Sequence, residues 1–96
     1  MIAEDRKAID RRLARIEGQV RGLRRLVQED VYCCDVLQQI SATTSALNQV
    51  AATIASGHIK HCIAGHGTEA AHATAKQMSQ DDLLDELDEV MKRLMR

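Results

Sequence analysis

The sequence contains no proline, phenylalanine or tryptophan, and Tyr32 is its single aromatic residue. Sheets prefer aromatic and β-branched side chains, so this composition disfavours a β-rich fold. Proline is the residue that most often interrupts helices, and its absence permits long ones. With only five glycines and 45% apolar residues in 96, the chain is expected to form one small all-α domain spanning residues 1–96.

Long apolar runs are also absent. No segment approaches the roughly 20 apolar residues that a membrane-spanning helix needs, and residues 1–10 lack the apolar region of a secretory signal. We therefore expect a cytoplasmic protein with no membrane partner. No Ser/His/Asp-type group, pair of catalytic carboxylates or phosphate-binding loop is visible, so an enzyme is not expected.

Acidic and basic residues are separated along the chain, although the net charge is only −1. Between residues 6 and 25, eight basic residues stand against two acidic ones, a local charge of +6. The basic residues are Arg6, Lys7, Arg11, Arg12, Arg15, Arg21, Arg24 and Arg25. Such a stripe favours a polyanionic partner, but a solvated helix with ion pairs gives the same pattern. No recognition-helix turn, zinc finger or aromatic RNA platform accompanies it, so any DNA contact would be largely electrostatic.

The spacing of apolar residues predicts three helices. The first spans about residues 5–28, and the second about residues 31–63, with Asp30 as its expected N-cap. Apolar positions recur in both helices at alternating steps of three and four, which is typical of a helix packed lengthwise against others. Gly65 and Gly67 end the second helix. Ser79 is expected to cap a last helix, and the sequence leaves residues 68–78 open between a helix and a mobile connector.

Cys33, His58 and Cys62 form the most informative pattern in the chain. His58 and Cys62 are four residues apart, so on a helix they lie on one face and can hold one ion together. Cys33 is 25 residues before His58 on the same predicted helix, roughly 37 Å away at 1.5 Å per residue. The three side chains can meet only if Cys33 comes from a second, antiparallel chain. The spacing therefore predicts both a soft-metal site and a dimer.

Two thiolates and one imidazole suit Cu(I), whereas Zn(II) would need a fourth ligand such as water, Cys34 or His61. A cysteine on an apolar helix face is also commonly a buried packing residue. Considered alone, each of the cysteines could have this role instead of binding a metal. The expectation for Cys34 is a structural role. His61, His66 and His72 are expected to be solvated.

Two runs of the sequence resemble the copper-sensing operon repressor (CsoR) family, whose members sense copper, nickel or cobalt, formaldehyde, or persulfides. The first run extends from Arg12 to Leu23 and reads RLARIEGQVRGL; the second extends from Asp30 to Ala42 and reads DVYCCDVLQQISA. The segment HIKHC, His58 to Cys62, continues the similarity, which covers about residues 5–63.

This resemblance implies a three-helix protomer that forms an antiparallel four-helix-bundle dimer, assembled further as a dimer of dimers. It implies a repressor that binds double-stranded operator DNA without metal and is released by Cu(I), so that copper efflux or resistance genes are expressed. By this resemblance, the metal ligands of the family correspond to Cys33, His58 and Cys62. The residues beside the metal site correspond to Tyr32 and Glu86, and the DNA-binding residues correspond to Arg12 and Arg15.

The family's other subtypes differ at these same positions. Persulfide sensors lack a histidine at the position of His58, nickel or cobalt sensors have histidine in place of Cys62, and formaldehyde sensors lack a cysteine there. Copper sensing is therefore the prediction. The alternatives are sensing of nickel or cobalt, or of a persulfide or oxidant through Cys33 and Cys62 of facing chains, or a copper buffer or chaperone that does not bind DNA. After Cys62 the chain departs from the family pattern through a longer connector, which makes the match of Glu86 depend on the alignment.

Overall fold

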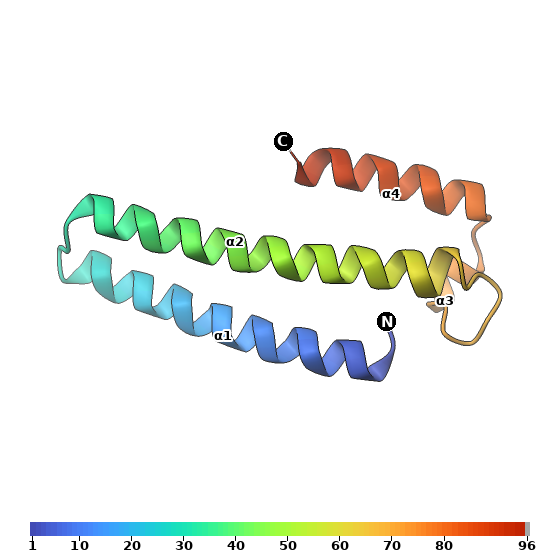
Figure 1. Cartoon of the computed structure of the whole chain (residues 1–96), viewed down its shortest axis with the longest axis horizontal. Coiled ribbons are helices and arrows are strands. Elements are labelled where there is room, and N and C mark those ends of the chain that lie inside the picture. The colour runs from blue at the N-terminus through green and yellow to red at the C-terminus, as the bar shows by residue number, and fades with distance from the viewer. Residues whose placement is uncertain (96) are drawn as a thin grey trace. The chain divides into compact units, whose positions relative to one another are not determined.

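The computed structural model describes residues 1–95, which contain helices and no strand. The helices are α1 (Ala3–Gln28), α2 (Cys33–His58), the π-helix η1 (Ile59–Ile63), α3 (Ala73–Lys76) and α4 (Gln80–Leu94), drawn in Figure 1. The all-α prediction is confirmed. The three expected helices are present; η1 replaces the last turn of the second one, and the short α3 lies in the segment that the sequence left open. The chain divides into two compact units, residues 3–54, which we call the hairpin, and residues 1–2 with 55–96, which we call the C-terminal unit.

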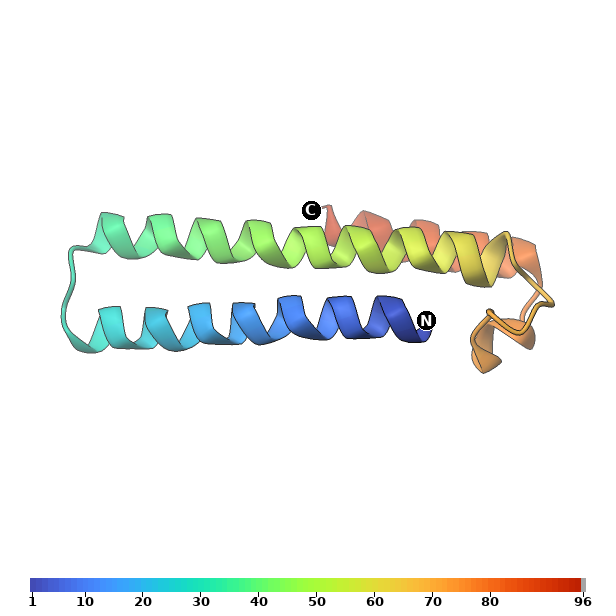
Figure 2. The same ribbon diagram turned by 60° about the horizontal axis from the view of Figure 1, so that its bottom comes forward.

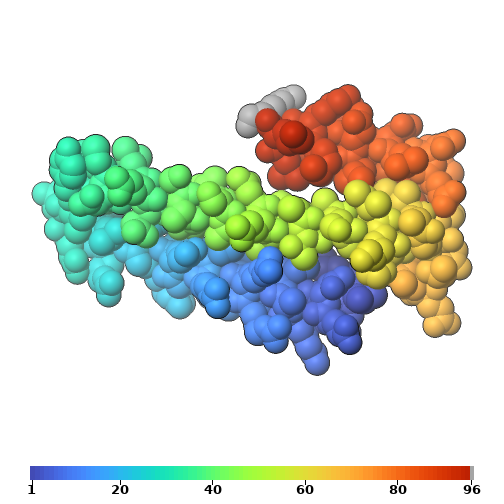
Figure 3. All heavy atoms as spheres, viewed as in Figure 1, coloured from blue at the N-terminus to red at the C-terminus, as the bar shows by residue number. Residues whose placement is uncertain are grey.

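The hairpin consists of α1 and the first part of α2, which run antiparallel and side by side in two views (Figures 1 and 2). Its buried core contains Ile9, Ile16 and Val50, with Ala46 packed against them. Thr43 is buried as well, and its Oγ1 donates to the Gln39 carbonyl oxygen at 3.0 Å, so the hydroxyl is satisfied within its own helix. Side chains fill the space between the two helices (Figure 3).

Only one of the two apolar positions in each heptad is buried in the hairpin. Ile9 and Ile16 are seven residues apart and face α2, and Thr43 and Val50 repeat this spacing on α2. The alternate apolar positions are exposed on both helices. These exposed positions are Leu13, Val20 and Val27 on α1 and Ile40, Leu47 and Ile54 on α2. A single copy of the hairpin thus leaves half of the predicted apolar pattern without a packing partner.

The turn between α1 and α2 is a Schellman motif. The Val31 N–H donates to the Leu26 carbonyl at 3.0 Å, the Asp30 N–H donates to the Val27 carbonyl at 3.2 Å, and Asp30 has φ of 54°. The prediction that Asp30 caps the second helix is therefore wrong, because Asp30 ends the first helix instead. The second helix begins three residues later, where the Tyr32 carbonyl accepts the first helical hydrogen bonds.

Asp30→Gly is expected to raise the free energy of unfolding by about 0.5–1 kcal/mol. An L-residue in the left-handed region is strained by about 1–2 kcal/mol, and part of the relief is offset by the greater backbone entropy of glycine in the unfolded chain. Urea denaturation followed by circular dichroism measures the change. Glu29→Gly is the matched control, since Asp30 is the one non-glycine residue with positive φ among residues 1–95. That control should destabilise the protein, and equal effects at the two positions would contradict the assignment.

In the C-terminal unit, α2 passes without interruption into η1. The Ala64 N–H donates to the Ile59 carbonyl at 2.8 Å, a bond that spans five residues rather than four. The predicted cap of the last helix is confirmed, since the Asp82 N–H donates to Ser79 Oγ at 3.1 Å. No helix within residues 1–95 is long and apolar enough to cross a membrane.

Candidate metal site and nucleic-acid interface

The predicted metal ligands lie at opposite ends of α2. Cys33 is the first residue of this 26-residue helix and His58 is the last, so the helix itself separates them by roughly 37 Å. Cys33, its neighbour Cys34 and Tyr32 are all exposed at the N-terminal end. A thiol at this end of the helix is open to a group approaching from outside the chain.

His58 and Cys62 stand on either side of the change from α-helix to π-helix. His58 ends α2 and is half-buried, whereas Cys62 lies in η1 and is only 4% exposed. The π-helix carries more residues per turn, so the direction of Cys62 relative to His58 differs from that in an uninterrupted α-helix. The sequence predicted an ordinary helix through residue 63, and this change of hydrogen bonding is a correction to it. Insertions of this kind are frequent at functional sites.

Cys62 Sγ is held inside the C-terminal unit. It accepts the backbone N–H of His72 at 3.4 Å. Around it, Ile63 of η1, Ala75 of α3 and Leu83 of α4 form a buried apolar cluster. The thiol thus has one polar partner and otherwise apolar surroundings.

No group of three or more His, Cys, Asp or Glu side chains within residues 1–95 is arranged to hold a metal ion. One chain therefore supplies a thiol at one end of α2 and a histidine–thiol pair at the other end, without bringing the three together. The donors present are two thiols and an imidazole, which are ligands that soft metals prefer. Their chemistry fits Cu(I), provided that a second chain contributes its Cys33.

The residues expected beside the metal site are both exposed. Tyr32 is 67% exposed at the start of α2, and Glu86 lies on the exposed side of α4. Neither belongs to a metal-holding group within the described chain, so their role stays a prediction.

Two histidines have structural partners that the sequence did not indicate. His66 Nε2 lies 2.6 Å from the Met78 carbonyl oxygen. Because a carbonyl only accepts, His66 Nε2 must carry the hydrogen and donate it. His72 is the N-cap of α3, with its Nδ1 accepting the Thr74 N–H at 3.1 Å. His72 is exposed, as expected, although its ring also caps a helix, whereas His66 is half-buried and hydrogen-bonded rather than simply solvated.

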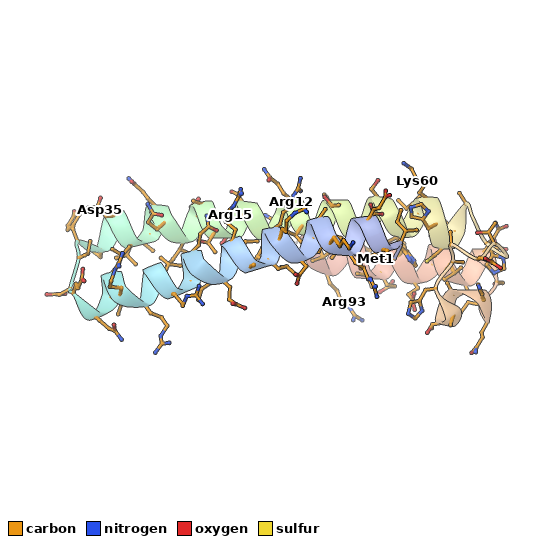
Figure 4. All side chains as sticks on the ribbon, turned by 90° about the horizontal axis from the view of Figure 1, so that it is seen from below. Met1, Arg12, Arg15, Asp35, Lys60 and Arg93 are labelled. Carbon is orange, nitrogen blue, oxygen red and sulfur yellow. The ribbon has the colours of Figure 1, made fainter. Side chains whose placement is uncertain are left out.

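The basic residues of α1 form the candidate nucleic-acid interface. All eight of those between residues 6 and 25 are exposed. Arg21 pairs with Glu17 at 3.7 Å, but both side chains are highly exposed, so this ion pair contributes little. Figure 4 shows Arg12 and Arg15 on neighbouring turns of α1. Arg12 also donates to Thr53 Oγ1 at 3.4 Å, a long hydrogen bond that leaves most of its donors available.

The comparisons with known proteins agree with this geometry. Residues 5–96 match the model of a family described as metal-sensitive transcriptional repressors. The chain is 57% identical over 53 residues to the copper-sensing transcriptional repressor RicR of Mycobacterium tuberculosis, and this aligned segment covers 55% of each protein. It is 45% identical over 62 residues to the copper-sensing transcriptional repressor CsoR of Bacillus subtilis, and this alignment covers 65% of this chain and 61% of that protein. The chain thus spans less than two thirds of the length of these two relatives.

The structural comparison extends over the whole chain. The crystal structure of the copper-sensing repressor CsoR with Cu(I) from Geobacillus thermodenitrificans matches with a TM-score of 0.81 and 36% sequence identity. The match covers 100% of this chain and 92% of that one. The resemblance predicted from residues 12–42 and 58–62 is confirmed. The chain belongs to the family of metal-sensitive transcriptional repressors.

Proposed function

We propose that this protein is a cytoplasmic, Cu(I)-responsive transcriptional repressor that binds double-stranded operator DNA without metal and is released when Cu(I) binds. One observation carries the proposal most directly. A single helix of a metal-sensitive repressor presents a thiol at its first residue and a histidine at its last, with a second thiol four residues further on. The relatives named above as copper-sensing repressors support the choice of metal.

The metal site comprises Cys33 of one chain and His58 and Cys62 of a second chain. The length of α2 and the lack of a metal-holding group within residues 1–95 both support ligands shared between chains. Cu(I) is a soft ion, and thiolate and imidazole are ligands that it would bind at this site. Tyr32 and Glu86 are the residues we assign to hydrogen bonds around these ligands, where they would fix the orientation of the imidazole.

The exposed apolar residues of the hairpin support the assembly. Leu13, Val20, Ile40 and Leu47 alternate with the buried residues of α1 and α2, so they form a second apolar face on the same two helices. An antiparallel second hairpin would cover this face and complete a four-helix bundle. The same antiparallel arrangement takes Cys33 of each chain to the far end of its partner's α2. We propose that two such dimers form a tetramer.

The exposed basic stripe of α1 provides the DNA contact. Arg12 and Arg15 are the residues we assign to phosphate contacts, with the other basic residues of α1 strengthening the field. Each chain of the assembly repeats the stripe, so several phosphates are neutralised together. Binding should therefore weaken steeply as salt is raised.

Release from DNA requires the metal-free and metal-bound forms to differ in DNA affinity. His58 and Cys62 both belong to the C-terminal unit, and Cys33 belongs to the hairpin of the other chain. Bringing these ligands together therefore fixes the hairpin of one chain to the C-terminal unit of its partner, and α1 moves with its hairpin. A coupling free energy of about 1–3 kcal/mol corresponds to a loss of about 5- to 150-fold in DNA affinity.

The test is an anaerobic titration of the reduced protein with Cu(I), Zn(II) and Ni(II). Fluorescence anisotropy of labelled DNA from the upstream promoter of its own gene reports binding. Release at about one Cu(I) per chain, with weaker effects of the other two metals, is the expected result. Tight DNA binding that ignores Cu(I) but responds to Ni(II) or to a persulfide donor would overturn the copper assignment. Copper binding without any salt-sensitive DNA binding would indicate a copper buffer instead.

A further inference from the structure

The connector between η1 and α4, residues 64–79, folds back over Cys62 within the C-terminal unit. Both α3 and α4 pack against η1. Cys62 shares its buried cluster with Ala75 from the connector and Leu83 from α4, and Met78 packs against the same cluster. Ala71, just before α3, is buried too. As a result the Cys62 side chain is almost completely enclosed by its own chain.

Three hydrogen bonds hold this connector in place. The backbone N–H of His72 donates to Cys62 Sγ at 3.4 Å. His66 Nε2 donates to the Met78 carbonyl at 2.6 Å and ties the start of the connector to its end. Gln80 Nε2 donates to the Ile63 carbonyl at 3.0 Å, next to Cys62 itself. The connector is thus bonded to itself and to the thiol, and the first residue of α4, directly after it, is bonded to the backbone of η1.

The first turn of the connector is tightly packed as well. A Cβ added at Gly65 would lie 2.8 Å from the His61 carbonyl oxygen, and a carbonyl of the helix backbone cannot move aside easily. Gly67 has φ of 85°, which L-residues rarely adopt. Two glycines on either side of His66 therefore permit the sharp return that directs His66 toward Met78.

This enclosure limits the access of reagents and of a second chain to Cys62. A metal ligand must present a sulfur lone pair to the incoming ion, and the shared site also requires the thiol of a second chain to approach. Cys62 is 4% exposed and its Sγ already accepts the His72 N–H. The closed connector therefore restricts the approach of an external reagent to the thiol.

We propose that residues 64–79 are a cap that closes over Cys62, and that opening of the cap controls when this thiol can react with or bind a soft electrophile or metal. His66 and Gln80 are the residues that hold the cap shut. The proposal depends on the proposed function only where it assigns Cys62 to a metal site. The enclosure of the thiol rests on contacts within the C-terminal unit alone.

The test measures how fast Cys62 reacts with 5,5′-dithiobis(2-nitrobenzoate) in metal-free protein that carries Cys33→Ser and Cys34→Ser. In this reaction the Cys62 thiolate attacks the reagent's disulfide, forms a mixed disulfide and releases one thionitrobenzoate, which is read by its absorbance. A second protein with Cys34→Ser and Cys62→Ser retains the exposed Cys33 as reference. We expect Cys62 to react at least about tenfold more slowly than Cys33, and to match it when both proteins are unfolded in urea.

His66→Ala and Gln80→Ala, each in the Cys62-only protein, are expected to speed the reaction about fivefold, since each removes one hydrogen bond that stabilises the closed cap. Glu69→Ala is the matched control, because Glu69 is an exposed residue of the same connector. It should leave the rate unchanged. Far-UV circular dichroism verifies that each variant retains its helices, and if one of the two cap variants does not, the other decides.

Equal rates in the Cys62-only protein and in its His66→Ala and Gln80→Ala variants would overturn the proposal, as would a Cys62 that reacts as fast in the folded as in the unfolded chain. Hydrogen exchange at the His72 amide provides an independent measurement. Protection supports the cap, and exchange at the rate of an unstructured amide contradicts it. These measurements use neither metal nor DNA, so failure of the cap and failure of the copper-responsive repressor are distinguished.

Discussion

Replacing Cys33 with alanine is expected to abolish Cu(I)-driven release of operator DNA while leaving DNA binding by the metal-free protein unchanged. Cys33 is the only ligand that the second chain contributes to each proposed site, so without it one thiolate and one imidazole remain. The wild-type loss of about 5- to 150-fold in DNA affinity on adding Cu(I) should fall to less than about twofold. Anaerobic anisotropy titrations at fixed salt measure both affinities.

Cys34→Ala is the matched control for this experiment. Cys34 follows Cys33 directly, is also exposed and points roughly 100° away around the helix. Its replacement should leave Cu(I)-driven release intact. A Cys33→Ala variant that releases DNA as the wild type does would refute the site, and loss of release in Cys34→Ala alone would transfer the ligand role to the neighbouring thiol.

Mixing variants tests whether the ligands come from two chains. Neither Cys33→Ala nor Cys62→Ala has a complete site as a homodimer. A heterodimer of the two has one complete site, made of Cys33 from the Cys62→Ala chain and His58 with Cys62 from the other chain. Mixed and reannealed protein should therefore regain part of the Cu(I) response. If mixing restores nothing while heterodimers form, the ligands do not combine across chains as proposed.

Much of the fold was predictable because helical periodicity and the absence of proline are strong local signals. The bounds of α1 and the cap at Ser79 followed from them. The error at Asp30 has a physical origin. Aspartate is favoured both at helix N-caps and in the left-handed conformation that ends a helix, and only the hydrogen bonds of Val31 and Asp30 to the preceding helix distinguish the two.

The metal ligands were predictable from spacing and resemblance, but their local environment was not. The change to a π-helix at Ile59 follows from no side-chain signal that we recognise in the sequence. The partner of Cys62 Sγ is the backbone N–H of His72, which any residue other than proline could supply at that position. The Gly65 to Gly67 segment indicated the end of a helix, yet not that the following chain would return over Cys62.

Leu47→Glu is expected to separate the proposed dimer and raise its dissociation constant at least about 100-fold. Leu47 is 46% exposed in the single chain and lies in the apolar stripe with Ile40 and Ile54, which a second hairpin would cover. Burying an unpaired carboxylate in such an interface costs several kcal/mol, and about 2.7 kcal/mol already corresponds to 100-fold. Sedimentation equilibrium over a range of concentrations measures the change.

Helix content should fall along with assembly in this variant. A two-helix hairpin with a core as small as that around Ile16 and Val50 has little stability of its own, so much of it must come from the partner chain. Thermal melts of the wild type should accordingly shift upward with concentration, whereas Leu47→Glu should melt low at every concentration. Ser45→Glu is the control, because Ser45 is also exposed but lies about 200° around the helix from Leu47. A Leu47→Glu protein that sediments and melts like this control would show that the apolar stripe is not the dimer interface, and Cys33 could then no longer be brought to its partner by this antiparallel pairing.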